Sequence, residues 1–281
     1  MQTFEEILGD IKSLKIQGAT NVALAILKFL SETPGATKEM GEALAYARPT
    51  EPLAQNAILY IFSGSTESLQ EKINAYTAMI DDAKKKIAIQ GGAIIQNGKT
   101  YLTHCHSSTV TQLLINAHAS SVIATETRPL MQGRMTAREL LDGGINDVTM
   151  IIDDAAASVL ADPKRNIAGI FVGADLLSDQ GFVNKIGTLS IVLAARENNI
   201  PVYCISTVLK YDPRPFDQSL IETRNPKEIW ADAPKNVKIY APAFDFTLYN
   251  LGVTLVTEAG MIKKDYGKSL SQLFSATGIN R

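Results

Sequence analysis

The chain has 281 residues, of which 46% are hydrophobic and 20% are Asp, Glu, Lys or Arg. This length is enough for one large or two modest domains with a proper core, and the moderate charge content excludes a disordered, highly charged chain. The 27 basic and 29 acidic residues leave a net charge of −2. That balance argues against a general nucleic-acid binder, whose footprint is basic.

The sequence also argues against secretion and against membrane insertion. It starts with MQTFEEILGD, which is acidic and mixed, unlike a signal peptide. The longest run without Asp, Glu, Lys or Arg, residues 100–125, contains three His and many polar residues, which rules out a membrane span. Cys105 and Cys204 are too few and too far apart for a disulfide framework. We therefore expect a reduced, cytoplasmic protein.

The first ninety residues predict helices. Thr3 and Glu6 have the spacing of a capping box, and apolar residues at helical intervals follow them. Residues 22–30 predict a second helix, and an apolar residue at every third or fourth position over 69–87 predicts a long one. We therefore predict an N-terminal helical domain over residues 1–90.

The pattern changes after residue 92, which predicts a second domain over residues 91–281. Asn97-Gly98 lies between the apolar runs 93–95 and 100–102, a spacing that predicts a β-hairpin. Further on, short apolar runs alternate with segments of helical length, which predicts an α/β fold with a parallel sheet covered on both faces. The expected strands are 121–125, 148–152, 167–172 and 201–205, with weaker ones at 237–240 and 254–256, and the expected helices are 107–118, 133–141, 154–160 and 185–197.

Polar side chains follow each expected strand. In an open parallel sheet, ligands bind beyond the carboxyl ends of the strands. We therefore expect one rim that holds a thiol, a carboxylate, an arginine and a lysine. The segments that follow the strands are THCHS (103–107), ETRP (126–129), Asp153-Asp154, Gly173-Ala174-Asp175, and Ser206, Thr207 and Lys210.

Cys105 lies between an expected strand and the start of an expected helix. A helix N-terminus stabilises a thiolate, so we expect a lowered thiol pKa, with a buried, inert cysteine as the alternative. For Cys204, which lies inside the apolar run PVYCIS, the inert alternative is preferred. A zinc site formed by Cys105 with His104 and His106 is disfavoured, because adjacent strand residues point to opposite faces.

Other candidate groups suit a phosphorylated ligand. Asp175 follows the small residues of IFVGAD and is either a catalytic carboxylate or a turn residue. Residues 18–21 precede a helix and offer backbone N–H groups to a phosphate, with a plain interhelical turn as the alternative. Arg128 and Lys210 are suitable anion ligands or ordinary surface charges.

Together these residues predict a site for a phosphorylated small molecule with a thiol and a carboxylate as an acid–base pair. Such a pair suits proton transfer next to a carbonyl or hemiacetal, as in aldose–ketose isomerisation. No GxGxxG motif follows the first strand, which disfavours NAD, and we expect neither a metal nor an organic cofactor.

Five motifs in order resemble one superfamily: THCHSS, TETRPLMQGRMTARELLDGGI, IDDAA, FVGADLLSDQGFVNKIGT and APAFDFT...VTEAGMI. It contains ribose 1,5-bisphosphate isomerase, methylthioribose 1-phosphate isomerase and the alpha, beta and delta subunits of translation initiation factor 2B. The similarity runs from about Ile16 to Ile262. It implies a helical domain followed by a Rossmann-like parallel-sheet domain, and homodimers or hexamers that are trimers of dimers.

The resemblance also implies roles for individual residues. Cys105 and Asp175 match the catalytic pair of the isomerases, and the HCHS form is most similar to that of ribose 1,5-bisphosphate isomerases. The positions that match substrate-binding residues are Gly18, Ala19, Arg48, Arg128, Asn184, Lys185 and Lys210.

The sequence departs from the pattern of the isomerases at three places. Gln17 replaces an arginine, Thr20-Asn21 stands where a second basic residue is expected, and Leu248 replaces the proline of FDVTP. The first two changes remove positive charge from a phosphate subsite. We expect an isomerase that converts ribose 1,5-bisphosphate, or a related sugar 1-phosphate, to the ketose. The alternative is a non-catalytic regulatory protein, similar to initiation factor 2B, that binds a nucleotide or sugar phosphate and a protein partner.

Overall fold

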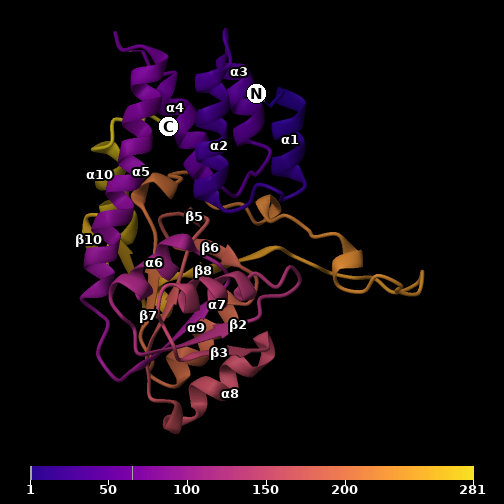
Figure 1. Ribbon diagram of the computed structural model, residues 1–281, viewed down its shortest axis with the longest axis vertical. Coiled ribbons are helices and arrows are strands. Elements are labelled where there is room, and N and C mark those ends of the chain that lie inside the picture. Colours follow the sequence, from indigo (N-terminus) through magenta and orange to yellow (C-terminus); the bar gives the residue numbers. More distant parts are fainter. Residues whose placement is uncertain (1, 65) are drawn as a thin grey trace.

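A computed structural model of the protein describes residues 2–64 and 66–281. A helical part lies above a part built around a parallel sheet, and one long helix, α5, runs along both (Figure 1). The helices are α1 (Phe4–Lys12), α2 (Ala19–Glu32), α3 (Lys38–Ala45), α4 (Pro52–Ile61), α5 (Leu69–Gly92), α6 (Ser108–Asn116), α7 (Gly133–Asp142), α8 (Ala156–Ala161), α9 (Thr188–Glu197) and α10 (Tyr266–Ser275).

Local capping explains where two of the helices begin. The Thr3 hydroxyl accepts from the backbone N–H of Glu6, and the Glu6 carboxylate accepts from that of Thr3, so the predicted capping box is confirmed. Ser68 and Glu71 form the same arrangement at the start of α5. The predicted apolar side of α5 is also confirmed, because its residues from Ile73 to Ile87 at this spacing are buried.

The predicted fold class is confirmed. In the described residues the main sheet has the order β10-β9-β7-β4-β1-β2-β3, and all its neighbouring strands are parallel except β9 and β10. The connections move outward from β1 in both directions, which is the Rossmann-like order, and the switch point lies between β1 and β4. The strands are β1 (Thr100–His104), β2 (Ser121–Thr125), β3 (Val148–Ile151), β4 (Ile167–Val172), β5 (Leu176–Leu177), β6 (Gly181–Lys185), β7 (Val202–Ile205), β8 (Phe244–Leu248), β9 (Val253–Thr257) and β10 (Gly260–Ile262).

The predicted hairpin around Asn97-Gly98 is wrong. Residues 93–95 form a turn after α5, in which the Ile94 N–H donates to the Gly91 carbonyl. β1 pairs in parallel with β2 on one side and with β4 on the other, so both of its edges are occupied by strands from later in the chain. The Asn97-Gly98 pair therefore forms a turn directly before β1, which is a central strand of the sheet.

Two other elements differ from the prediction. The expected helix 185–197 begins only at Thr188, because Lys185 is the last residue of β6, which pairs antiparallel with β5 and β8 in a small second sheet. Residues 237–240 are coil instead of a strand. They belong to the long irregular stretch between β7 and β8, part of which projects from the side of the molecule in Figure 1.

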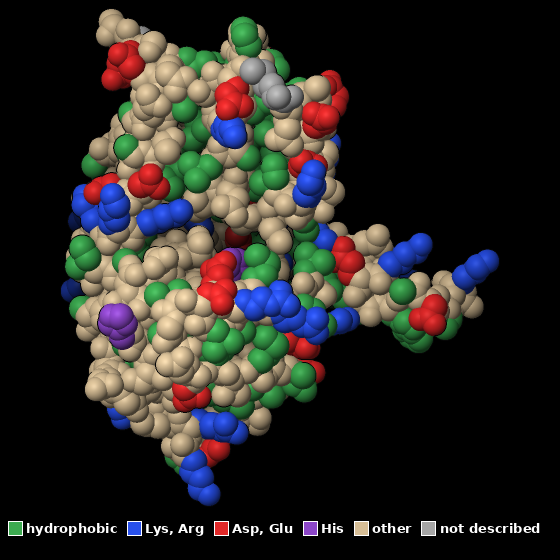
Figure 2. Space-filling view, viewed as in Figure 1, with side chains coloured by type: hydrophobic (Ala, Val, Ile, Leu, Met, Phe, Trp, Pro, Cys, Tyr) green, Lys and Arg blue, Asp and Glu red, His purple; other side chains and the backbone are tan. Residues whose placement is uncertain are grey.

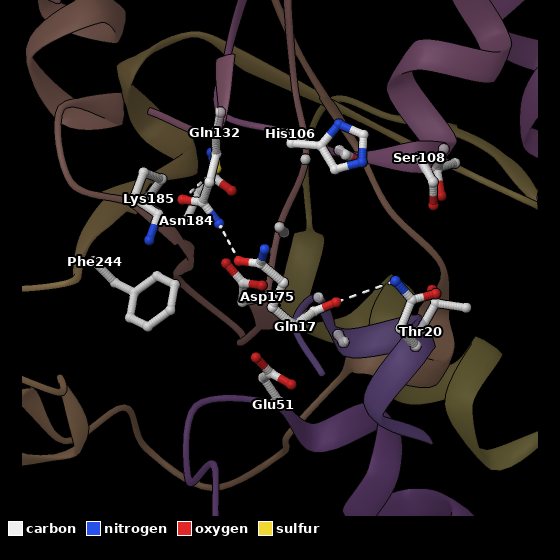
Figure 3. A pocket seen from close by; sticks show the side chains of 18 of the residues that line it. Gln17, Thr20, Glu51, His106, Ser108, Gln132, Asp175, Asn184, Lys185 and Phe244 are labelled. Atoms are coloured by element: carbon white, nitrogen blue, oxygen red, sulfur yellow. Dashed lines mark hydrogen bonds between the residues drawn. The ribbon is translucent and has the colours of Figure 1, made fainter. Parts of the chain in front are cut away.

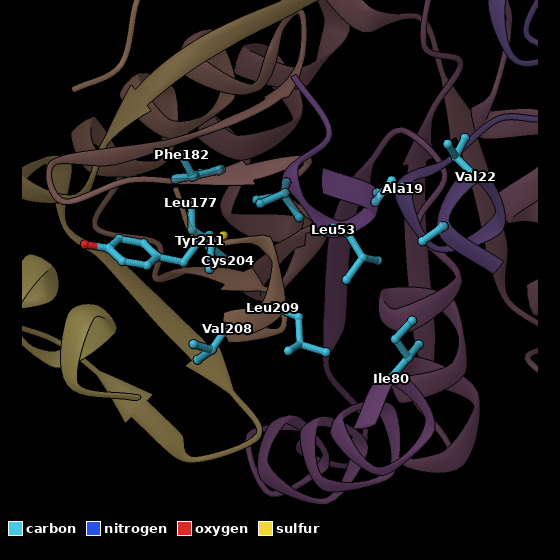
Figure 4. Packing of buried hydrophobic residues seen from close by; sticks show 14 of the residues in the cluster. Ala19, Val22, Leu53, Ile80, Leu177, Phe182, Cys204, Val208, Leu209 and Tyr211 are labelled. Carbon is cyan, nitrogen blue, oxygen red and sulfur yellow. The ribbon is translucent and has the colours of Figure 1, made fainter. Parts of the chain in front are cut away.

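The helical and sheet parts share one hydrophobic core. Side chains from α2, α4 and α5 pack into the same cluster as Leu177, Val208 and Leu209 from the sheet part (Figure 4). The buried Asn56 amide donates to the carbonyls of Leu209 (2.8 Å) and Tyr211 (3.0 Å), which fixes α4 against the short 3-10 helix 208–210. The helical part is therefore packed over the carboxyl ends of the parallel strands.

Across the described residues, none of the helices combines the length and the apolar character needed to cross a lipid bilayer.

Candidate active site

A pocket lies where the helical part meets the carboxyl ends of β1 and β4. Figure 2 shows the molecule hollowed between these two parts, and Figure 3 shows the side chains that point into the pocket. Eight of the nine predicted site residues line it: Gly18, Ala19, Arg48, Cys105, Asp175, Asn184, Lys185 and Lys210. The sulfur and the carboxylate of the predicted pair therefore face the same space.

Cys105 is fixed in the pocket through its backbone. It follows β1 with a φ of 70°, its N–H donates to the Thr127 hydroxyl (3.0 Å), and its carbonyl accepts from the Thr136 hydroxyl (2.9 Å). The thiol donates to the Gln132 side-chain oxygen at a sulfur–oxygen distance of 3.6 Å. These contacts hold the half-buried thiol at the switch point of the sheet.

The predicted lowering of the Cys105 pKa is wrong. The pKa of this thiol is raised to about 11, chiefly by burial, with smaller opposing effects of Lys185, which lowers it, and Asp175, which raises it. α6 begins at Ser108, and the hydroxyl of its capping residue, Ser107, accepts from the Val110 N–H, so the helix starts three residues beyond the cysteine. The effect of a helix N-terminus fades within about one turn and does not outweigh burial here. Cys105 is therefore a neutral thiol near pH 7, suited to donate a proton.

Asp175 follows β4, and its backbone N–H donates to the Val183 carbonyl (2.8 Å). Burial raises the pKa of its carboxyl group, against the opposing effects of Lys210, Lys185 and Arg48. A carboxylate with a raised pKa is a better proton acceptor near neutral pH than an exposed one. The arrangement therefore gives a proton donor and a proton acceptor in one pocket.

Gly173 allows α6 to approach this site closely. A Cβ atom at residue 173 would lie 2.9 Å from the Ser107 hydroxyl oxygen and 3.0 Å from the Ser107 Cβ. Any larger residue would therefore push the start of α6 away from β4. The small residue at position 173 therefore has a structural cause, which is packing against the start of α6.

Arg48 and Lys210 are held by partners within the protein. Arg48 Nη2 lies 3.2 Å from a carboxylate oxygen of Glu51, and its Nε donates to Glu222 (2.7 Å). The Lys210 ammonium donates to the Ala174 carbonyl (2.7 Å). Burial lowers the pKa of Lys210, while Asp175 and Glu51 oppose this shift. The two cations thus form a compact charge network with carboxylates around Asp175.

Lys185 and Asn184 come from the end of β6. The Lys185 ammonium lies 4.7 Å from the centre of the Phe244 ring, and the Asn184 amide donates to the Thr188 hydroxyl (2.9 Å). In Figure 3, Lys185 and Phe244 lie on one side of the pocket, while Thr20 and Ser108 lie on the other. The small antiparallel sheet thus supplies one side of the pocket.

The start of α2 contributes backbone groups to the opposite side. Gly18, with a φ of 85°, precedes the first helical residue and has no side chain to cap the first turn. The free N–H groups of a helical first turn, together with the helix dipole, favour an anion. Gln17 accepts a hydrogen bond from Gln132 (3.1 Å), which links this loop to the partner of the Cys105 thiol (Figure 3).

Arg128 lies outside the pocket. Its side chain is exposed, and its guanidinium donates to the carbonyls of Glu228 (3.5 Å) and Ile229 (3.4 Å). Its backbone N–H donates to the Asp153 carboxylate (2.7 Å), which also accepts from Thr127 (2.8 Å). The ETRP segment therefore supports the Cys105 loop through Thr127, and the structure does not bring the Arg128 side chain to the site.

Sequence reasoning missed several residues that shape the pocket. Glu51 and Gln132 line it, and Asp245 of β8 accepts from the backbone N–H groups of Gly187 (2.8 Å) and Leu189 (3.1 Å) next to it. Burial raises the pKa of Asp245 to about 6. In the sequence Glu51 is visible only as a charged residue directly before the apolar segment that starts at Pro52, which does not indicate its role.

The chain belongs to the initiation factor 2 subunit family, whose model matches residues 17–264. Ribose 1,5-bisphosphate isomerase of Archaeoglobus fulgidus is 32% identical, over 93% of this chain and 90% of that protein. 5-Deoxyribose 1-phosphate isomerase of Moorella thermoacetica is 30% identical, over 98% of this chain and 90% of that protein. The resemblance found in the motifs is therefore confirmed.

The chain is also similar in fold to a solved structure of a protein named as a translation initiation factor. Translation initiation factor eIF-2B of Pyrococcus horikoshii aligns with a TM-score of 0.79 at 27% identity, covering 92% of this chain and 96% of the other. The family thus includes proteins named as isomerases and proteins named as initiation factors.

Proposed function

We propose that the protein is an aldose–ketose isomerase that converts a ribose 1-phosphate derivative, with or without a second phosphate, to the ketose. The observation that carries this proposal is the placement of Cys105 and Asp175 in one pocket, next to Lys185 and Lys210. Relatives that are 30–32% identical over most of the chain bear the names of sugar-phosphate isomerases, which supports this reaction class.

The protonation states favour one assignment of the two proton transfers. The Cys105 thiol, with its pKa raised to about 11 by burial, donates its proton to the ring oxygen as the bond from that oxygen to C1 breaks. Asp175 accepts the proton of the C2 hydroxyl. The hydrogen on C2 moves to C1 with its electron pair, which leaves a ketone at C2. Proton return from Asp175 to the Cys105 thiolate then restores the site, so atoms and charge balance.

We expect the phosphate on C1 to bind at the first turns of α2 and α6. Ala19, Thr20 and Ser108 line this side of the pocket, and backbone N–H groups at two helix N-termini favour a dianion. Lys185, on the other side, is suited to hold a sugar hydroxyl or the oxygen that becomes the ketone. Asn184 beside it supplies a neutral hydrogen-bonding group.

The test follows ketose formation from ribose 1-phosphate and from ribose 1,5-bisphosphate by NMR. We expect turnover by the wild-type protein and a loss of at least about 100-fold in kcat in Cys105→Ser and in Asp175→Asn, because each removes a proton-transfer group. Binding of the sugar phosphate should persist in both variants. Cys204→Ser, which changes the buried cysteine outside the pocket, is the matched control for thiol loss.

Binding of a sugar phosphate by the wild-type protein without any ketose would contradict the isomerase and favour the regulatory alternative. This alternative is supported by the start of α2, where the pocket is lined by the uncharged residues Gln17, Thr20 and Asn21 in place of basic ones.

A further inference from the structure

Glu51 is a buried carboxylate in the pocket that the proposed reaction does not use. Its side chain is 2% exposed, and one of its oxygens lies 3.2 Å from Arg48 Nη2. The other oxygen, Oε2, is buried and has no hydrogen-bond partner among residues 2–64 and 66–281. Figure 3 shows the Glu51 carboxyl group directed toward Asp175.

An unpaired oxygen of a buried carboxylate is energetically costly, and a hydrogen-bond donor on a ligand removes that cost. The protein itself fixes Glu51 in place, because it directly precedes Pro52, the first residue of α4, and because Arg48 holds its other oxygen. Glu51 therefore presents a preformed acceptor to whatever occupies the pocket. Hydroxyl groups of a sugar are donors of the required kind.

The charges around Glu51 oppose a second phosphate. The carboxylates Glu51 and Asp175 line the pocket, and the Glu222 carboxylate accepts a hydrogen bond from Arg48 Nε. Arg48 is thus shared between two carboxylates. Lys210 donates to a carbonyl and interacts electrostatically with both Asp175 and Glu51. With Lys185 included, these three cations and three carboxylates sum to zero formal charge.

A phosphate group adds about 1.5 to 2 negative charges at pH 7. The first turns of α2 and α6 can neutralise one such group, and Gln17 next to them is an uncharged amide whose oxygen already accepts from Gln132. A second phosphate bound near Arg48 or Lys210 would lie close to the Glu51 and Asp175 carboxylates, and a contact with Arg48 would compete with the two carboxylates that already hold it. In a buried site, repulsion between like charges weakens ligand binding more than the loss of one favourable contact does.

We infer that the ligand is a pentose monophosphate, and that Glu51 accepts a hydrogen bond from one of its hydroxyls and excludes the bisphosphate. This inference rests on the proposed function for the identity of the sugar. It makes Glu51 a specificity-determining residue, and it narrows the substrate class to ribose 1-phosphate and analogues that keep a free hydroxyl in place of the second phosphate.

Calorimetric binding separates this inference from the proposed reaction. We would measure the Kd of ribose 1-phosphate and of ribose 1,5-bisphosphate in the Cys105→Ser background, which blocks turnover, at pH 8. At that pH most of Glu51 is ionised, since burial raises its pKa to about 7. We expect the monophosphate to bind at least about 30-fold more tightly, and Glu51→Gln to reduce this ratio by about 10-fold or more.

Glu222→Gln is the matched control, because it also removes one negative charge that is bound to Arg48, whereas Glu222 is not among the residues that line the pocket. We expect it to change the ratio by less than about 3-fold. An equal shift in both variants would show that general electrostatics, and not the free oxygen of Glu51, sets the preference. Thermal unfolding of each variant shows that the ratios come from folded protein.

The outcomes are distinct. Tighter binding of the bisphosphate, or a ratio unchanged by Glu51→Gln, overturns the inference, even if the wild-type protein is an isomerase. Selective binding of the monophosphate without ketose formation supports the inference and contradicts the proposed reaction. Failure of both sugar phosphates to bind overturns both.

Discussion

Cys105 illustrates how burial decides the chemistry of a single residue. Two hydroxyl-bearing side chains, Thr127 and Thr136, fix its backbone, and Gln132 accepts from its thiol. Burial raises the pKa of the thiol to about 11. A group that stays protonated at neutral pH is ready to donate to a ring oxygen, while a thiolate would first have to gain a proton.

This protonation state predicts the pH dependence of thiol alkylation. The thiolate is the reactive form, so the rate at which iodoacetamide modifies Cys105 should rise about tenfold per pH unit up to at least pH 10. The Cys105→Ser variant gives the background from Cys204, which is fully buried. A rate that levels off below pH 9 would contradict a raised pKa.

At the residue scale, the sequence predicted the pocket residues that follow a strand or open a helix. Cys105, Asp175 and Gly18 were found in this way, because strand ends and helix starts converge in such folds. The role of Glu51 was not predictable, since it depends on Arg48, which is also bound by Glu222, 174 residues away in the chain. The structure does not bring the Arg128 side chain to the pocket, and the motif alone could not predict this, because a motif shows that a residue is present but not where its side chain points.

At the scale of elements, the small antiparallel sheet brings Asn184 and Lys185 to the pocket. β6 pairs with β8, and Asn184 lies opposite Asp245 in this register. Asp245 in turn accepts from the backbone N–H groups of Gly187 and Leu189 at the start of α9. One carboxylate therefore ties the strand that carries Lys185 to the helix that follows it.

Replacement of Asp245 tests this link. Asp245→Ala leaves the start of α9 without its acceptor, and we expect a loss of about 1–2 kcal/mol in the free energy of unfolding, measured by urea denaturation. Asp245→Asn keeps an acceptor oxygen and should lose less. A change of less than about 0.5 kcal/mol in Asp245→Ala would show that α9 does not depend on this side chain.

Elements differed in how well the sequence predicted them. The central parallel strands are buried on both faces, so they appear as continuous apolar runs, and β2 and β4 match their predicted ranges. β5, β6 and β8 were missed, because they are short, because β6 and β8 carry polar residues such as Asn184 and Asp245, and because the partner that β6 finds in β8 comes from much later in the chain. The Asn97-Gly98 signal was local, whereas the neighbours of β1 come from residues 121–125 and 167–172.

At the scale of the whole molecule, the pocket exists because the helical part is packed over the sheet. Asn56 of α4 binds the carbonyls on either side of Lys210, and the shared core continues from α2 and α4 to residues 208–209 (Figure 4). The first turn of α2, Glu51 and Arg48 come from one part, while Cys105 and Asp175 come from the other. Local sequence patterns cannot predict this juxtaposition, because it depends on contacts between distant segments.

A crystal structure of the Cys105→Ser variant with ribose 1-phosphate tests the central claim most directly. We predict that the sugar lies between residue 105 and Asp175, with its phosphate at the first turns of α2 and α6, so that one ligand contacts both parts of the chain. A sugar phosphate bound away from either residue 105 or Asp175, in a fully occupied and well-ordered position, would contradict acid–base catalysis by this pair.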